Sequence, residues 1–563
     1  MLSSFLNLAS RLLARKMKLP AARYRHIKMD CDLKVVMPDG AILLTDRYFP
    51  SGITDAPIVL TRTPYGRGRE SSLLWRMLAG LGYQVVVQSV RGTFGSGGAF
   101  DPLRHEAVDG LATLRWLEQQ SWFTGKVGLF GGSYFGYTQW AVAADAPPWI
   151  KAMVPLITAT DWRPLFYSGE SFGLWTAASW MHSLHHQESS WWRFVLSERR
   201  QVKTLEQALA HLPLNEIDKV LVGHRVSYYQ DWLVHDRPGD GFWSQVNQSR
   251  RLVSMTIPTS LLATWYDIFL PAQLADYVTL RKAGHRPQLI IGPGTHDSPQ
   301  TVELGVRQTV DWFDTHLRDA PSPPNASPVR VYMLGADTWI DFPDWPPPAS
   351  PEIWFLQSGR ELARDLPTTS PPDAYTYNPA DPTPTIGGVM LGAAAGPRDN
   401  RALEARPDVV SYTSAPLDRD LPVIGLVSVV LYVRSSCEYT DFFTRLCDVA
   451  PNGVSTNICD GLLRLSPENI TAGRDGIIRV RTDLWPTACL FAKGHRLRLQ
   501  VSSGSHPRFS RNTGSGEPLA TATTLHVAHQ QIFHDPEHPA ALILPVYRKL
   551  TTDMGEVTPT EYP

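Results

Sequence analysis

VGLFGGSYFGYTQWAVAA, residues 127–144, is the stretch that decides the fold. Its first four residues form a short apolar run typical of a buried strand, and its alanine-rich end is typical of a buried helix. Ser133 lies between them among glycines, as in the strand–turn–helix motif that exposes a nucleophilic serine. Such a turn is tight and strained, so it needs small neighbours. The usual pattern is G-x-S-x-G, and here the last glycine, Gly136, comes one position late. A purely structural glycine turn is therefore the alternative interpretation.

The composition is that of a globular protein of several domains. The chain has 563 residues, of which 43% are hydrophobic and 19% charged, with a net charge of -1. This length exceeds a single core, so roughly two to four domains are expected. The balanced charge argues against a nucleic-acid partner. Five cysteines without a C-x-x-C pair indicate thiols in a reducing compartment, so a cytoplasmic protein is expected.

The N-terminus carries its own pattern. Apolar residues between Leu2 and Met17 share one helical face, and basic residues gather at the far end. A secretory signal would carry its charge before the apolar segment. We therefore expect a terminal helix that docks on the body of the protein or on a second subunit. A helix lying on a membrane surface is the alternative. Both a homo-oligomer and a membrane-surface contact are left open.

Short apolar runs then alternate with helical patterns. A turn signature at Pro38-Asp39-Gly40 predicts a hairpin. Further on, Pro57–Leu60 and Val85–Gln88 predict buried strands, while residues 71–81 and 102–119 predict helices. This alternation, continued by residues 127–144, predicts a parallel sheet covered by helices on both faces.

Two later apolar runs end in residues that a serine hydrolase needs. One ends at Asp267, and the other ends in a glycine-bearing loop at His296. In open parallel sheets, functional groups lie just past the carboxyl ends of strands. A hydrolase of this kind orders its triad as serine, acid, histidine. We expect His296 to act as general base for Ser133, and Asp267 to orient the His296 ring. The backbone N–H of the following residue, Tyr134, is the expected oxyanion donor.

Three motifs occur in an order and spacing shared with one known family. They are Tyr65 after Thr63-Pro64, the loop from Arg91-Gly92 to Gly98, and the elbow with its late Gly136. The chain resembles the cocaine esterase / X-prolyl dipeptidyl-peptidase group of serine hydrolases, peptidase family S15 or CocE/NonD hydrolases, over nearly its whole length. In that family the late glycine is usual, and Trp-Tyr-Asp and Gly-Pro-x-x-His motifs fall on the acid and the histidine. The resemblance implies that the hydroxyl of Tyr65 is the second oxyanion donor.

The resemblance also implies a domain plan. It implies an α/β-hydrolase fold with an inserted helical cap and a C-terminal all-β jelly-roll sandwich. The expected division is 1–30 as an N-terminal helical segment, 31–160 and 251–320 as the two parts of the hydrolase domain, 161–250 as the cap, and 328–563 as the jelly roll. Prolines near residue 320, followed by short β runs from Val329–Met333 onward, support the last boundary.

The expected cap is rich in aromatic residues, Trp191 and Trp192 among them. Most should form the core of the cap, and a few should line a large apolar acyl or alcohol pocket. The pocket residues that we expect are Trp162, Phe166, Trp175 and Phe269. Relatives that hydrolyse α-amino acid esters carry acids just after the triad aspartate, whereas Ile268-Phe269-Leu270 stands here. This difference makes the amino-ester and aminopeptidase alternatives less favoured. It does not exclude them, because Glu170 and Glu188 in the cap could hold an ammonium.

The sequence thus predicts a serine hydrolase that cleaves a carboxylic ester, or an amide, through an acyl-enzyme on Ser133. An acyltransferase or cyclase and an X-Pro-type peptidase are alternatives on the same site. A catalytically silent binding relative is the second alternative. The expected partner is a small-molecule ester or amide. No metal cluster, phosphate loop or dinucleotide fingerprint is found, so neither a metal nor a cofactor is expected.

Overall fold

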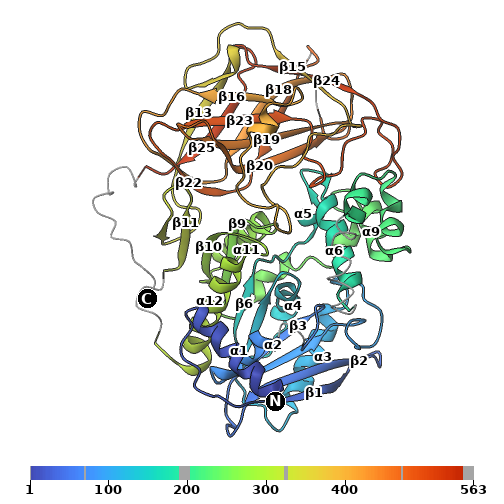
Figure 1. The fold of residues 1–563 in the computed structure, drawn as a ribbon, viewed down its shortest axis with the longest axis vertical. Coiled ribbons are helices and arrows are strands. Elements are labelled where there is room, and N and C mark those ends of the chain that lie inside the picture. Colours follow the sequence, from blue (N-terminus) through green and yellow to red (C-terminus); the bar gives the residue numbers. More distant parts are fainter. Residues whose placement is uncertain are drawn as a thin grey trace.

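The computed structural model describes residues 2–68, 72–188, 203–321, 327–470, 473 and 475–548. An α/β body and a β-rich body lie one above the other (Figure 1). The segment around α5, α6 and α9 lies to one side of their junction. Within the described part of the chain, no helix combines the length and the apolarity needed to cross a bilayer.

A ten-stranded sheet organises the α/β body, in the order β1-β2-β4-β3-β5-β6-β9-β10-β11-β12. Every pair from β4 to β11 is parallel, and the pairs at both edges are antiparallel. The strands are β1 (Ile27–Val36), β2 (Ile42–Pro50), β3 (Ile58–Thr63), β4 (Gln84–Ser89), β5 (Val127–Gly132), β6 (Ile150–Leu156), β9 (Ser260–Tyr266), β10 (Gln288–Thr295), β11 (Val329–Met333) and β12 (Thr338–Phe342).

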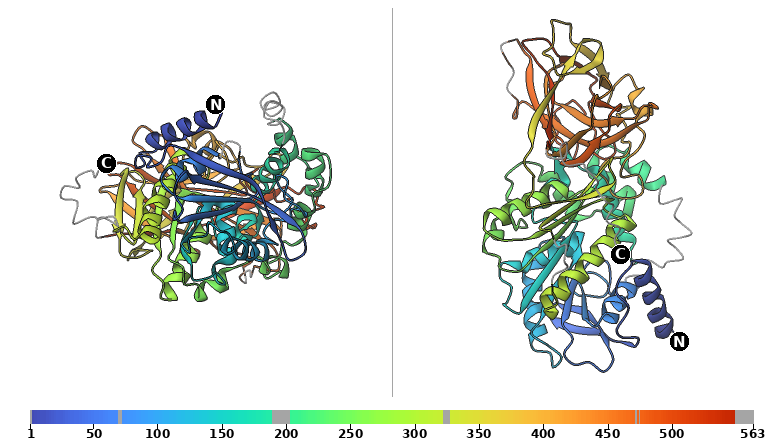
Figure 2. Two further views of the ribbon diagram at one scale, coloured as in Figure 1. Left: turned by 90° about the horizontal axis from the view of Figure 1, so that it is seen from below. Right: turned by 90° about the vertical axis from the view of Figure 1, so that its left-hand side faces the viewer.

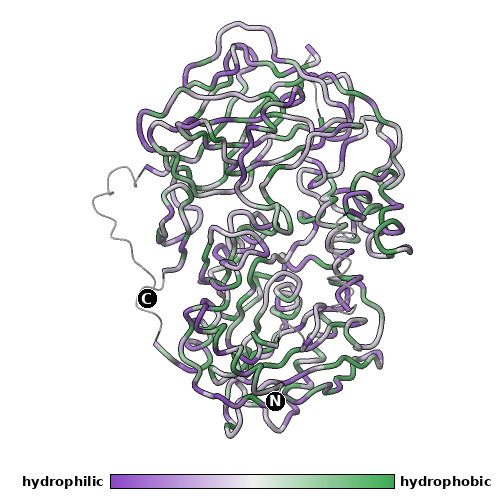
Figure 3. Tube along the Cα trace, in the orientation of Figure 1, coloured by the Kyte–Doolittle hydropathy of each residue, from purple (hydrophilic) through white to green (hydrophobic). Residues whose placement is uncertain are grey.

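Helices cover both faces of this sheet. On one face lie α2 (Ser72–Gly80) and α12 (Pro299–Arg318), and on the other lie α3 (Glu106–Glu118), α4 (Ser133–Ala143) and α11 (Leu270–Lys282). Successive side chains of a strand point to opposite faces. Accordingly Val85 and Val87 join the core under α2 and α12, whereas Val86 joins the opposite core. Hydrophobic segments therefore run through the interior strands (Figure 3).

The N-terminal helix α1 (Leu2–Lys16) docks on α2, as the first interpretation predicted (Figure 2). Ala14 is buried against Met77, and Arg76 donates a hydrogen bond to the Asn7 side chain at 2.9 Å. The outward face keeps three apolar residues exposed: Phe5, Leu8 and Leu12. Contact of this face with a membrane or with a second subunit stays a prediction.

The predicted cap is built mainly of short helices. They are α5 (Arg163–Phe166), α6 (Leu174–His186), η1 (Leu214–Glu216), α8 (Ile217–Val222), α9 (Ser227–Val234), α10 (Gly241–Ser244) and η2 (Ser249–Ser254). A small hairpin, β7 (Tyr167–Ser168) and β8 (Ser171–Phe172), was not predicted. Most described aromatic residues are buried, among them Phe172, Trp232 and Trp243. Trp191 and Trp192 lie outside the described residues.

The C-terminal body is an all-β unit of thirteen strands. All its ladders are antiparallel except the short one between β14 and β16. The strands are β13 (Ser350–Gln357), β14 (Glu361–Ala363), β15 (Asp373–Tyr377), β16 (Val410–Ser414), β17 (Leu421–Gly425), β18 (Ser428–Ser435), β19 (Thr440–Val449), β20 (Ser455–Leu465), β21 (Ile478–Asp483), β22 (Thr487–Phe491), β23 (Arg496–Ser502), β24 (Ala528–Phe533) and β25 (Ala541–Val546), with η3 (Ser358–Arg360) and α13 (Arg401–Glu404) between them. The predicted fold class is confirmed.

The predicted start of the C-terminal domain, at residue 328, is wrong. Residues 328 onward were expected to belong to the sandwich, but β11 extends the α/β sheet. It runs parallel to β10, with Val329 opposite Leu289. A β-rich composition does not reveal which sheet a strand joins, because that depends on edge pairing far along the chain. Likewise β1 begins at Ile27, inside the expected helical segment 1–30. The remaining domain limits stay predictions.

Candidate active site

Ser133 lies where strand β5 turns into helix α4, as the elbow pattern predicted. Its backbone φ is +53°, in the left-handed region that non-glycine residues rarely adopt. Such strain persists where the surrounding structure enforces it, and it clusters at functional sites. No side chain caps the N-terminus of α4, so its backbone N–H groups face the space beside Ser133. This helix end favours negative charge.

The late glycine of the elbow has a packing reason. A Cβ built on Gly136 would lie 2.4 Å from the Cγ2 atom of Thr158, which is fully buried. The segment after β6 therefore passes directly against the first turn of α4. Only a residue without a side chain allows this approach, so position 136 is where the motif needs its glycine.

Asp267 and His296 follow neighbouring parallel strands, β9 and β10, and meet at one edge of the sheet. The Nδ1 atom of His296 lies 2.6 Å from Oδ2 of Asp267. The other carboxylate oxygen accepts a hydrogen bond from the backbone N–H of Phe269 at 2.7 Å. Asp267 is fully buried and His296 is 7% exposed. Because Nδ1–H donates to the carboxylate, Nε2 is left as the acceptor.

The charge of Asp267 sets the basicity of this histidine. Burial by itself lowers the pKa of His296, because it disfavours the imidazolium. The nearby Asp267 carboxylate and its hydrogen bond outweigh burial and raise the pKa above the ordinary value of 6.5. A buried imidazole that is paired in this way is a stronger base than a free one.

Tyr65 lies just beyond strand β3 and faces the serine. Its hydroxyl accepts a hydrogen bond from the indole N–H of Trp180 at 3.1 Å and also hydrogen-bonds with the side chain of Ser133. Its ring packs edge-on against Phe135, with 6.0 Å between centroids. The ordinary pKa of a tyrosine already lies well above neutral pH, and burial raises the pKa of Tyr65 further, so the phenol is protonated. A protonated phenol is a hydrogen-bond donor.

The side chain of Tyr134 anchors the residue that follows the serine. It is fully buried, its hydroxyl donates to Oε1 of Glu106 at 2.8 Å, and it accepts from the backbone N–H of Leu103 at 2.9 Å. Glu106 in turn forms a buried ion pair with Arg62 at 2.9 Å. The backbone of Tyr134 is thereby held beside Ser133. Sequence reasoning missed Glu106, because a lone glutamate in a helix carries no catalytic signature.

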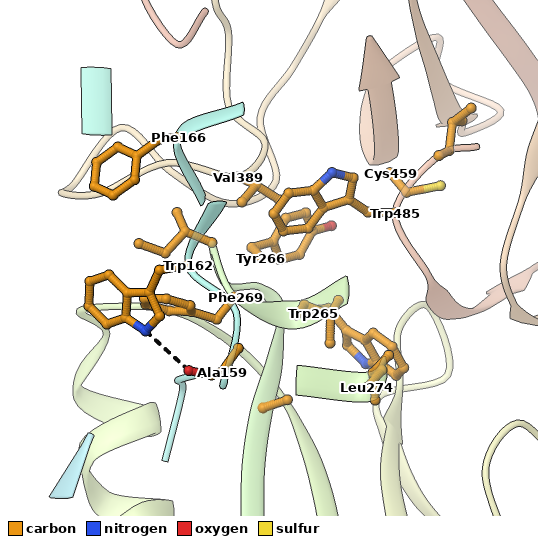
Figure 4. Packing of buried hydrophobic residues seen from close by; sticks show 14 of the residues in the cluster. Ala159, Trp162, Phe166, Trp265, Tyr266, Phe269, Leu274, Val389, Cys459 and Trp485 are labelled. Carbon is orange, nitrogen blue, oxygen red and sulfur yellow. Dashed lines mark hydrogen bonds between the residues drawn. The ribbon is translucent and has the colours of Figure 1, made fainter. Parts of the chain in front are cut away.

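A cavity of about 330 Å³ joins these groups. Ser133, Tyr65 and His296 line it, together with three of the four pocket residues that the sequence predicted: Trp162, Trp175 and Phe269. Trp162 packs against Phe269 with 4.8 Å between ring centroids (Figure 4). Sequence reasoning missed Trp180, Leu165 and Ile268, which also line the cavity.

The prediction of Phe166 as a pocket residue is wrong. Its side chain is fully buried, does not line the cavity, and stacks on Trp232 at 4.3 Å between centroids. It lies on α5, directly after the pocket residue Leu165. Neighbouring residues of a helix point in different directions, so aromatic richness alone could not separate core from lining.

The C-terminal body supplies one wall of the cavity. Leu391 and Gly392, in the segment between β15 and α13, line it. The indole N–H of Trp175 donates to the carbonyl of Leu391 at 2.8 Å, and the N–H of Gly392 donates to Asp297 at 3.0 Å. No local signal marks this segment, because its contacts are made with residues distant in the sequence.

The two cap acids considered for an ammonium do not line the cavity. Glu170 pairs with Arg163 at 2.8 Å, and Glu188 accepts the backbone N–H of Phe94 at 2.9 Å. Asp297 is the carboxylate that does line it. Among the residues that the structure describes, no group of three or more histidine, cysteine or acidic side chains is arranged to hold a metal ion.

Comparison with known proteins agrees with this geometry. Residues 39–298 match the family model for X-Pro dipeptidyl-peptidase (S15 family), and residues 324–543 match that for the X-Pro dipeptidyl-peptidase C-terminal non-catalytic domain. The chain is 30% identical to the cocaine esterase of Rhodococcus sp. (strain MB1 Bresler), over 92% of this chain and 98% of that protein. The chain belongs to peptidase family S15, the CocE/NonD hydrolases. As a member of S15, it is a serine hydrolase that acts on esters or peptides.

Solved structures show the same fold at lower identity. An aminopeptidase from the marine sediment archaeon Thaumarchaeota archaeon matches this S15 hydrolase with a TM-score of 0.79 and 21% identity, covering 94% of this chain and 97% of the other. A CocE/NonD family hydrolase from Staphylococcus aureus matches with a TM-score of 0.69 and 18% identity, covering 92% and 93%. The family resemblance inferred from the sequence is thus confirmed.

Proposed function

We propose that this S15 hydrolase is a serine esterase that cleaves a small carboxylic ester through an acyl-enzyme on Ser133. The observation that carries the proposal is the His296–Asp267 pair, hydrogen-bonded at 2.6 Å, in the same cavity as a serine held at a strained elbow. A serine hydroxyl is a weak nucleophile until an adjacent base takes its proton. The cocaine esterase relative, of which the chain covers nearly all, acts on an ester by its name.

In the first half-reaction, Ser133 attacks the ester carbonyl while Nε2 of His296 takes its proton. The tetrahedral intermediate collapses, the C–O bond to the alcohol breaks, and His296 returns the proton to the leaving alcohol. Asp267 holds the ring and stabilises the imidazolium that forms. In the second half-reaction, water attacks the acyl carbon while Nε2 of His296 takes one of its protons. The bond from the acyl carbon to Oγ of Ser133 then breaks, His296 returns the proton to Oγ, and the carboxylic acid leaves.

The negative oxygen of each tetrahedral intermediate needs donors placed beforehand. The Tyr65 hydroxyl and the backbone N–H of Tyr134 fill this role in the proposal. Two observations support it: the raised pKa of Tyr65, which keeps its proton, and the buried Tyr134–Glu106 anchor beneath the helix end. The N-terminal end of α4 adds a favourable dipole.

An uncharged acyl or alcohol group suits the cavity. Ile268 and Phe269, directly after Asp267, line it and bring no charge. At about 330 Å³ the volume lies near the lower end of ligand pockets, which span roughly 300–1,000 Å³. The cavity therefore favours a group of about one ring or a short chain.

One observation favours a second candidate, a peptidase of the X-Pro type. Asp297 brings a carboxylate to the cavity, where it could pair with the terminal ammonium of a peptide. This carboxylate already accepts a backbone N–H from Gly392, which partly occupies it. The esterase is therefore the stronger candidate.

The test is a burst experiment with nitrophenyl esters from acetyl to octanoyl. With an ester whose deacylation is slower than its acylation, the parent should release a rapid burst of nitrophenol equal to the enzyme present, because the acyl-enzyme accumulates. Ser133→Ala should show no burst. An aminoacyl-prolyl nitroanilide, run in parallel, tests the peptidase. Equal rates for the parent and Ser133→Ala would remove Ser133 as nucleophile, and turnover of the anilide alone would replace the esterase with the peptidase.

A further inference from the structure

The cavity has two chemically different sides. Trp162 and Phe269 form an apolar side. Helix α6 forms the other side, where Trp175 and Trp180 stand beside three hydroxyl-bearing residues that also line the cavity: Thr176, Ser179 and Ser183. An apolar binding site would be expected to carry alanine or leucine at such positions, so three hydroxyls on one wall call for an explanation.

The three residues share one face of the helix. They are spaced three and four positions apart, the spacing at which side chains lie one above the other. Trp180 lies beside them and donates its indole N–H to the hydroxyl of Tyr65 at 3.1 Å. The hydroxyl row is therefore next to the groups around Ser133, within reach of a substrate bound there.

Ser179 carries the main clue. Its Oγ atom is buried, and it has no hydrogen-bond partner among the described residues. A serine inside a helix normally bonds the carbonyl four residues earlier or points to solvent, and here it does neither. A buried hydroxyl without a partner costs free energy, so native structures rarely keep one without a reason. Because Ser179 also lines the cavity, a change of its side-chain rotamer would let a ligand atom there supply the missing partner.

The charged groups around the cavity restrict which kind of ligand atom can lie beside Ser179. Of the described side chains that line the cavity, the titratable ones other than Tyr65 are His296 and Asp297, and neither is on α6. A carboxylate or an ammonium placed against the row would therefore have no countercharge there. A hydroxyl, ether or carbonyl oxygen pairs with a serine hydroxyl without this penalty.

Resting on the proposed esterase function, we propose that Ser179, flanked by Thr176 and Ser183, selects esters that carry a neutral oxygen on the side facing α6. The apolar edge of the same group packs on Trp162 and Phe269. The substrate class is thus a ring or short chain with one hydroxyl, ether or keto oxygen, such as a hydroxylated aromatic ester.

The experiment compares matched pairs of esters on the parent and on Ser179→Ala. One pair, methyl benzoate and methyl 4-hydroxybenzoate, places the oxygen in the acyl group. The other pair, phenyl acetate and 4-hydroxyphenyl acetate, places it in the alcohol. The parent should prefer the oxygenated member of at least one pair in kcat/KM, by about tenfold for one buried hydrogen bond, and Ser179→Ala should remove that preference. The pair that responds identifies which half of the ester meets α6.

Two further variants serve as controls. Ser227→Ala makes the same change at an exposed cap position and should keep the preference of the parent. Ser179→Thr restores a hydroxyl and should recover most of it. Equal preference in the parent and Ser179→Ala, or an equal fall of kcat/KM for both members of each pair, would overturn the proposal.

A binding experiment tests the role of Ser179 independently of the proposed esterase function. If the parent turned over none of the esters, the esterase would fail, yet selection by α6 could still be measured. Acetophenone and 4-hydroxyacetophenone are neutral probes whose binding to Ser133→Ala can be followed by fluorescence of the cavity tryptophans. Tighter binding of the hydroxylated probe, lost in Ser133→Ala/Ser179→Ala, supports the proposal, and equal affinities contradict it.

Discussion

The role proposed for Tyr65 as an oxyanion donor depends on the hydrogen-bond partners and the burial of its hydroxyl. Here the Tyr65 hydroxyl accepts the indole N–H of Trp180 and also hydrogen-bonds with the side chain of Ser133, so it lies beside the proposed nucleophile, where it can turn to the carbonyl oxygen of a bound substrate. Burial raises the pKa of Tyr65 and keeps the proton of that hydroxyl in place.

Removing this hydroxyl tests the role directly. Tyr65→Phe keeps the ring and its packing on Phe135 but removes the donor. We expect kcat to fall by about 10²–10³-fold with little change in KM, because the donor acts on the transition state. Steady-state kinetics with a nitrophenyl ester measure the effect. Tyr24→Phe, a change far from the cavity, should match the parent. A fall confined to KM would instead assign Tyr65 to substrate binding.

The pH profile tests the His296–Asp267 pair. Because Asp267 raises the pKa of His296, the neutral base should be lost on acidification through a value above 6.5. The acid limb of kcat/KM in the parent should therefore lie above that value. Asp267→Asn removes the charge while burial remains, so the limb should move to lower pH and kcat should fall by about 10⁴-fold. An acid limb at the same pH in both proteins would contradict this coupling.

At the scale of elements, the elbow depends on the contact between α4 and the segment after β6. Gly136→Ala would force its Cβ to within 2.4 Å of Thr158. We expect a loss of about 1–3 kcal/mol of unfolding free energy, as for overpacking of a core, and a parallel loss of activity as Ser133 shifts. Chemical denaturation and ester hydrolysis measure both.

The matched control for that change lies in the cap. The backbone of Gly241, like that of Gly136, is outside the left-handed region, and a Cβ on Gly241 would meet nothing within 4 Å. Gly241→Ala should therefore leave stability and activity near those of the parent. If Gly136→Ala behaved in the same way, the late glycine would have no packing role.

The elements were predictable where a pattern is local. The strands before Asp267 and His296, and the turn around Ser133, each combine an apolar run with a break in a short window, so sequence alone placed them. The sheet that β11 joins and the orientation of Phe166 were not predictable in this way. Both depend on which surfaces meet after the chain has folded back on itself.

At the scale of the whole molecule, the cap and the C-terminal body meet at several contacts, and the tightest backbone approach among them is at Gly169. The hairpin turn at Gly169 lies against β20, where Arg464 donates its backbone N–H to the Gly169 carbonyl at 2.8 Å. A Cβ on Gly169 would lie 1.6 Å from the carbonyl oxygen of Leu462. The cap can close over the cavity in its present position only because this residue has no side chain.

Gly169→Ala should push the cap away from the C-terminal body. We expect a lower melting temperature and a lower kcat/KM, because α6 and its lining residues move with the hairpin. Gly223→Ala is the matched control: Gly223 also has a left-handed backbone, with φ of +82° against +56°, but open space around its Cβ position. The difference between the two variants therefore reports the contact rather than backbone strain. Equal melting temperatures and activities would show that this contact is dispensable.

The wall formed by Leu391 has a consequence for synthesis on the ribosome. Ser133, Asp267 and His296 all emerge before this wall, and the strands of the body that carries it continue to Val546. A nascent chain that has already built its elbow and its acid–base pair still lacks one side of its cavity. Hydrolytic competence toward a bound ester should therefore appear only after the C-terminal body has been synthesised and folded, and a chain released before Leu391 should be a poor esterase even if its first sheet is folded.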